Sequence, residues 1–128
     1  MRLLLDTHVF LWTQSDPERL RGQRELIEDT QNTLLVSAVT PWEITVKYGL
    51  GRLDLPEPPR HYVPERLLRL DAQGVSIEHA HVLAVAELPR LHRDPFDRLL
   101  VAQAKLLDAA IVTADPQVTQ YAVRTLMP

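Results

Sequence analysis

Two carboxylates stand at the start of an apolar segment that begins His92-Arg-Asp-Pro-Phe-Asp97. Asp94 is a favourable N-cap residue and Pro95 suits the first position of a helix, so Asp97 is expected in the first helical turn. Apolar residues then recur at helical spacing, which predicts one buried face: Phe96, Leu99, Leu100, Ala104 and Leu107. A carboxylate this close to a core needs a helix N-terminus, a partner or a metal ion to stay charged.

Three further acids occupy comparable places in the chain. Asp6 ends an apolar run at residues 2–6 that is typical of a buried strand, and Asp115 follows a second such run at residues 109–113. Glu43 is expected in the first turn of the helix that follows another strand. Each acid has a structural explanation, as a cap, a turn residue or a partner of the helix dipole, and for any one acid alone that explanation is favoured.

Short apolar runs alternate with helical patterns along the whole chain. Strands are predicted at residues 2–6, 33–37, 75–77 and 109–113, with a last edge strand at 121–126. Helices are predicted at 8–14, 18–29, 64–72, 79–88 and from Pro95 onward, with another that Thr40 caps and Gly49 ends. This alternation predicts an α/β fold with a small parallel sheet of four to five strands and helices on both faces, in a single domain spanning residues 1–128.

In such sheets ligands bind at the carboxyl ends of the strands, so the four acids are expected to meet at one crevice. Four carboxylates in one crevice repel one another, and they either take up protons or bind a hard divalent cation. Because the chain has no cysteine and no convincing set of histidines, Mg²⁺ or Mn²⁺ is favoured. Considered together, Asp6, Glu43, Asp97 and Asp115 favour a functional site over four unrelated structural roles.

Composition narrows the classes of function. The chain has 128 residues, 45% of them apolar, which suits a globular core. The absence of cysteine excludes disulfides, thiolate zinc sites and cysteine nucleophiles, and it fits the expected cytoplasmic location. No signal peptide or membrane-spanning segment is expected. With a formal net charge of -3, binding to nucleic acid must depend on local cations, for which the candidates are Lys47, Arg52, Arg93 and Arg98.

Five segments, at residues 4–8, 37–44, 47–53, 94–104 and 111–115, together resemble one known family in order and spacing. In them the chain resembles the PIN-domain ribonucleases, specifically the VapC-type toxins of bacterial type II toxin–antitoxin pairs. The resemblance implies a PIN-like fold and an endoribonuclease that depends on Mg²⁺ or Mn²⁺. It maps the family's conserved acids onto Asp6, Glu43, Asp97 and Asp115, and its supporting hydroxyl residues onto Thr7, Ser37 and Thr113.

The implied reaction is hydrolysis of a phosphodiester by a water molecule that the metal activates. Asp6, Glu43 and Asp97 are expected to bind the main cation, and Asp115 either completes that site or holds a second one. Asp94 is expected chiefly to cap its helix, with orientation of Arg98 as an alternative supporting role. A metal pair made of His92 and Asp94 is not favoured.

The resemblance also implies partners: a VapB-type antitoxin, a second copy of the chain in a homodimer, and an RNA substrate (tRNA, rRNA or mRNA). Trp12 and Trp42 are interpreted as core residues, with a partner surface as the alternative. Two other functions remain open. One is a catalytically silent PIN-like binding module. The other is a phosphatase of the haloacid-dehalogenase type, which is disfavoured because position 8 is histidine where that chemistry needs a second Asp.

Overall fold

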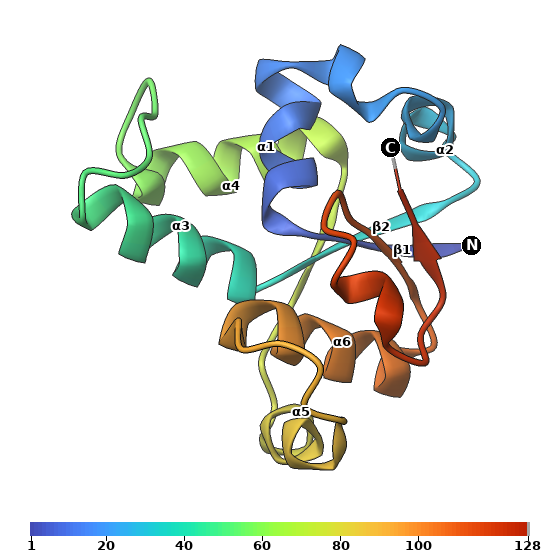
Figure 1. Cartoon of the computed structure of the whole chain (residues 1–128). Helices are drawn as coiled ribbons and strands as arrows, with labels where there is room; N and C mark the ends of the chain where they lie inside the picture. Colours follow the sequence, from blue (N-terminus) through green and yellow to red (C-terminus); the bar gives the residue numbers. More distant parts are fainter. Residues whose placement is uncertain (128) are drawn as a thin grey trace.

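The computed structural model describes residues 1–127 and contains a five-stranded parallel sheet around the buried leucines Leu3, Leu4 and Leu5 (Figure 1). The strands are β1 (Arg2–Leu5), β2 (Thr33–Ser37), β3 (Gln73–Val75), β4 (Ala110–Val112) and β5 (Thr125–Leu126). They lie in the order β3-β2-β1-β4-β5, and every neighbouring pair is parallel. The carboxyl ends of β1, β2 and β4 therefore lie at one edge of the sheet, which is where the four acids are expected.

Helices cover both faces of the sheet, and the leucines of β1 alternate between the two faces. Figure 1 shows α1 (Thr7–Ser15), α2 (Gln23–Glu28) and α4 (Pro59–Leu70) on one side, and α5 (His79–Ala84) and α6 (Pro95–Leu107) on the other. Leu3 and Leu5 belong to the first core with Phe10 of α1, whereas Leu4 belongs to the second core with Leu100 of α6. The predicted α/β fold with a small parallel sheet and helices on both faces is confirmed.

Several predicted boundaries are wrong. The helix predicted at residues 18–29 is divided into a 3-10 helix, η1 (Pro17–Leu20), and α2, because Arg21 takes a positive φ of 49° between them. The helix predicted from residue 64 begins at Pro59, where proline suits the first turn, and it continues through Pro64. Strand β3 begins at Gln73, two residues before the predicted start, so Gly74 lies inside it.

The start of α3 (Val39–Gly49) differs from the prediction in a way that affects the site. Thr40 is not its N-cap, because the helix begins at Val39 with Ala38 in the N-cap position. The hydroxyl of Ser37, at the end of β2, accepts the backbone N–H of Val39 at 3.0 Å. The helix therefore begins before Pro41, and Thr40 lies buried inside it. As a consequence, Glu43 lies beyond the first turn, on the buried side of the helix.

The start of α6 matches the prediction. The side chain of Asp94 accepts the backbone N–H groups of Phe96 and Asp97 at 2.9 and 3.2 Å, with Pro95 in the first position. Two further 3-10 helices, η2 (Val85–Glu87) and η3 (Val118–Gln120), flank α6 on the same side of the sheet. Within residues 1–127, no helix is both long enough and apolar enough to span a membrane.

Candidate functional site

Asp6 is fixed at the carboxyl end of β1 by two hydrogen bonds. Its Oδ1 accepts the backbone N–H of Val9 at 2.8 Å, which makes Asp6 the N-cap of α1. Its Oδ2 accepts the hydroxyl of Thr113 at 2.5 Å, from the segment that follows the neighbouring strand β4. The side chain is almost completely buried, and this burial raises the pKa of the Asp6 carboxyl although both hydrogen bonds oppose the change.

Glu43 reaches the same region from α3. Its Oε1 accepts the hydroxyl of Thr7, the residue after Asp6, at 2.7 Å. Its Oε2 forms an ion pair with the ammonium of Lys47, one helical turn further along. Thr7 and Thr113 thus donate hydrogen bonds that orient Glu43 and Asp6, whereas the hydroxyl of Ser37 accepts the backbone N–H of Val39, the first residue of α3.

Asp97 lies in the first turn of α6 and is surrounded by other acids. Burial, together with the negative charges of other carboxylates, raises the pKa of the Asp97 carboxyl to about 8. Those carboxylates belong to Asp94, Asp115, Asp6 and Glu43. All four predicted site acids are therefore close enough to interact electrostatically.

Asp115 lies in the turn after β4, as predicted. Its backbone N–H donates to the hydroxyl of Thr113 at 3.1 Å, and its Oδ1 accepts the backbone N–H of Gln117 at 2.9 Å. Thr113 therefore connects the turn of Asp115 to the carboxylate of Asp6, which holds the two acids at adjacent strand ends.

His92 lies beside Asp97 and Asp115, a position that no pattern in the sequence predicted. Its Nε2 lies 3.3 Å from Oδ2 of Asp97, and its Nδ1 lies 2.7 Å from the hydroxyl of Tyr121. Its side chain is only 6% exposed. One possible ligand atom each from His92, Asp97 and Asp115 lies within 4.8 Å of the others. His92 precedes the helix and follows no periodic pattern, so its nearness to Asp97 rather than Asp94 depends on the fold of the loop.

The oxygen-rich composition of the cluster suits a hard divalent cation. Carboxylates that lie close together and away from water are unstable as anions unless a cation or protons neutralise them. Carboxylate oxygens are the usual ligands of Mg²⁺ and Mn²⁺, and an imidazole nitrogen is compatible with Mn²⁺. The residues present therefore fit a metal ion of this class.

The four basic candidates differ in their surroundings. Lys47 faces the acids through Glu43. Arg98 donates to the carbonyls of Val85 and Pro89 at 3.2 and 2.8 Å and to the hydroxyl of Tyr121 at 3.1 Å, so its guanidinium braces the loop before α6. Asp94 accepts backbone N–H groups instead of a bond from Arg98. Arg52 and Arg93 are exposed.

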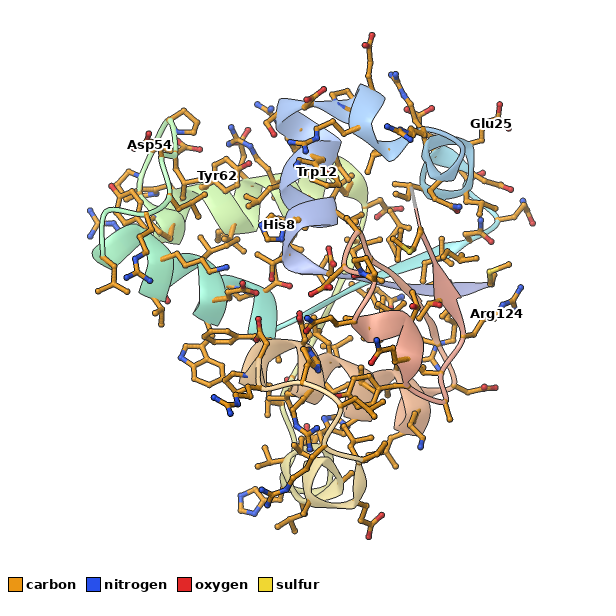
Figure 2. The ribbon with its side chains drawn as sticks, in the orientation of Figure 1. His8, Trp12, Glu25, Asp54, Tyr62 and Arg124 are labelled. Carbon is orange, nitrogen blue, oxygen red and sulfur yellow. The ribbon has the colours of Figure 1, made fainter. Side chains whose placement is uncertain are left out.

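The two tryptophans also differ. Figure 2 labels Trp12 and His8 on α1, and Trp12 is partly buried against the first core with the guanidinium of Arg19 4.3 Å from its ring centroid. Trp42 is 47% exposed and packs edge-on against Phe96, with ring centroids 4.6 Å apart. The core assignment is therefore wrong for Trp42, because its helix turns Glu43 rather than Trp42 inward.

Comparison with known proteins agrees with this architecture. A family model described as the PIN domain matches residues 3–124. Ribonuclease VapC16 of Mycobacterium tuberculosis (strain ATCC 25618 / H37Rv) is 43% identical over 58 residues, which make up 45% of this chain and 41% of that relative. The aligned part is thus less than half of the relative's length.

Two solved structures share the fold. One is VapBC2 from Rickettsia felis bound to a DNA fragment from its promoter, with a TM-score of 0.73, 17% identity, and coverage of 99% of this chain and 98% of that one. The other is DNA-bound VapBC from Salmonella typhimurium, with a TM-score of 0.72, 20% identity and the same coverage. Since the family model covers nearly all of the chain, the chain belongs to the PIN domain family.

Proposed function

We propose that the chain is the toxin of a type II toxin–antitoxin pair, of the VapC type, and that it acts as a metal-dependent endoribonuclease. The observation that carries this proposal is the convergence of Asp6, Glu43, Asp97 and Asp115 at the carboxyl edge of the sheet, where burial and the neighbouring carboxylates raise the pKa of Asp97. The name of the relative, a ribonuclease, supports the choice of RNA as substrate.

The chain's own groups supply an ordered anionic site. Hydrogen bonds from Val9 and Thr113 orient the Asp6 carboxylate, and Thr7 orients Glu43. Asp97 would give up its proton when a cation fills the site, because the cation would replace the proton as the neutralising charge. A bound Mg²⁺ or Mn²⁺ would neutralise the phosphodiester and lower the pKa of the attacking water.

Phosphate contacts are assigned to Lys47, Arg52 and Arg93. Lys47 is already beside Glu43, so its ammonium lies where a phosphate close to the acids would pass. Arg52 and Arg93 are exposed and available. Arg98 was a fourth candidate from the sequence. It is better explained as a structural residue that stabilises the loop before α6, because its guanidinium makes three hydrogen bonds. With so few cations, binding to RNA should be weak without a metal ion.

The proposed partners are a VapB-type antitoxin and a second copy of the chain. The two structural neighbours are described as VapBC assemblies, which supports an antitoxin here. An acidic crevice suits a basic segment of an antitoxin, for which an arginine entering near Asp6 and Asp97 would be the inhibitory contact. Exposed apolar side chains on α3, Trp42 at 47% and Val46 at 40%, offer surface for association.

The test is RNA cleavage by purified protein on defined tRNA, rRNA and mRNA substrates, with Mg²⁺, with Mn²⁺ and with a chelator. Asp97→Asn should abolish cleavage, whereas Asp94→Asn should keep most of it, because Asn still caps α6. The two variants make the same chemical change three residues apart. Metal-dependent cleavage that survives in Asp97→Asn would refute the assignment, and metal binding without any cleavage would favour the silent binding module.

A further inference from the structure

We infer that His92 is a ligand of the divalent cation, together with Asp97 and Asp115, and that this site consequently prefers Mn²⁺ to Mg²⁺. The inference deepens the proposed function, since it assumes that the carboxyl edge binds a divalent cation. It does not depend on which substrate is cleaved.

The distances match those between ligands of one ion. Nε2 of His92 is 3.3 Å from Oδ2 of Asp97, which is long for a hydrogen bond. Two ligand atoms at right angles, each about 2.1 Å from one ion, lie about 3.0 Å apart. A side-chain oxygen of Asp115 completes a triangle whose edges are all within 4.8 Å. A small movement of these side chains would therefore place all three around one ion.

The carboxylate oxygens of Asp6 and Glu43 are less available to a metal ion. Both oxygens of Asp6 accept hydrogen bonds, from Val9 and from Thr113, and both oxygens of Glu43 are engaged, by Thr7 and by Lys47. Within residues 1–127, the side chain of Asp97 has a single polar side-chain neighbour at hydrogen-bond distance, Nε2 of His92 at 3.3 Å. The carboxylate most available to an ion is therefore the one that His92 contacts.

The other side of the imidazole is held as in known metal sites. A histidine ligand usually binds metal through one nitrogen while the other nitrogen is hydrogen-bonded, which fixes the tautomer and the ring orientation. Here the hydroxyl of the buried Tyr121 lies 2.7 Å from Nδ1, and Arg98 donates to the same hydroxyl at 3.1 Å. With Nδ1–H donating to Tyr121, Nε2 presents its lone pair toward Asp97 and Asp115.

An imidazole ligand changes the selectivity expected of an all-oxygen site. Mg²⁺ prefers oxygen ligands and keeps several waters, whereas affinity for imidazole increases along the first transition series from Mn²⁺. A site of one imidazole nitrogen and two carboxylates should thus bind Mn²⁺ more tightly than Mg²⁺. The sequence alone indicated Mg²⁺, with Mn²⁺ as an alternative, because it placed no histidine among the acids.

The test is pulsed electron paramagnetic resonance of Mn²⁺ bound to the full chain, which detects coupling to a ligand nitrogen. The wild-type protein should show coupling to ¹⁴N that changes to the ¹⁵N pattern when histidine is labelled with ¹⁵N. His92→Gln should lose this coupling and weaken Mn²⁺ binding by about tenfold or more, with a smaller loss for Mg²⁺. The matched control is His79→Gln, on the exposed side of α5, which should keep both.

Tyr121→Phe is the second variant, and it guards against misfolding of His92→Gln. It should keep the nitrogen coupling while weakening Mn²⁺ binding several-fold, because it removes only the support of the ring. The inference is overturned if bound Mn²⁺ shows no histidine coupling in the wild type, or if the coupling persists in His92→Gln. If the coupling is found but no RNA is cleaved under any condition, His92 is still a ligand and the proposed function fails instead.

Discussion

At the scale of single residues, Asp97 should couple metal binding to pH. Burial and the neighbouring carboxylates raise the pKa of Asp97 to about 8, so a cation must displace a proton at neutral pH. We expect the affinity for Mn²⁺ or Mg²⁺ to rise by about tenfold per pH unit below pH 8 and then to level off. Calorimetry in buffers of different ionisation enthalpy would count the released protons. Affinity that is flat from pH 6 to pH 8 would contradict this.

Individual site residues were the feature that the sequence predicted best. The four acids were identifiable because their residue type and their place at the ends of apolar runs are both local properties of the chain. The contacts of His92 with Asp97 and Tyr121 join residues up to 29 positions apart through a loop, so no periodicity reveals them. Lys47 was assigned to phosphate, although its pairing with Glu43 follows from their spacing, because residues four apart on one helix share a face.

At the scale of elements, Asp94 should contribute to stability mainly as the cap of α6. Asp94→Ala removes both the charge and the acceptor for the N–H groups of Phe96 and Asp97, whereas Asp94→Asn removes only the charge. We expect Asp94→Ala to be less stable than Asp94→Asn by about 1 kcal/mol in the free energy of unfolding, measured with urea. Equal stabilities of the two variants would show that the cap contributes nothing.

Arg98 should act on the loop before α6 and not on RNA. Its guanidinium joins α6 to Val85, Pro89 and Tyr121. We expect Arg98→Ala to lose about 1.5–3 kcal/mol of unfolding free energy, the range for hydrogen bonds from a charged group. The salt dependence of RNA binding should stay unchanged in Arg98→Ala, whereas Arg93→Ala should reduce the slope by about one. The reverse pattern would make Arg98 the phosphate contact.

Element boundaries were less predictable than element types, and α3 shows the reason. Thr40 and Pro41 form a strong local signal for a helix start. The hydroxyl of Ser37 competes with that signal from the end of β2, and burial of Thr40 and Glu43 in the assembled sheet favours the earlier start. Local preferences of a few residues are smaller than the burial of a helix face, so tertiary packing decides the boundary.

At the scale of the whole molecule, two apolar cores stabilise the sheet from both faces while the acidic edge opposes folding. Folding raises the pKa of Asp97 from its usual 3.8 to about 8. Between pH 3.8 and about pH 8, the folded chain therefore keeps a proton on Asp97 that the unfolded chain has released. The stability due to that proton is fully present below 3.8 and is lost as the pH rises through about 8. Burial raises the pKa of Asp6 in the same direction.

The metal-free protein should therefore unfold more easily at pH 8 than at pH 6, and a divalent cation should reverse the loss. At 100 times its dissociation constant, a cation that binds only the folded state adds about 2.7 kcal/mol. Asp97→Asn cannot ionise at this position, so its metal-free form should exceed the wild type in stability at pH 8 and gain less from the cation. Urea unfolding at both pH values, with and without Mn²⁺, measures all these differences. If the metal-free wild type instead becomes more stable from pH 6 to pH 8, ionisation of Asp97 at the acidic edge does not destabilise the fold.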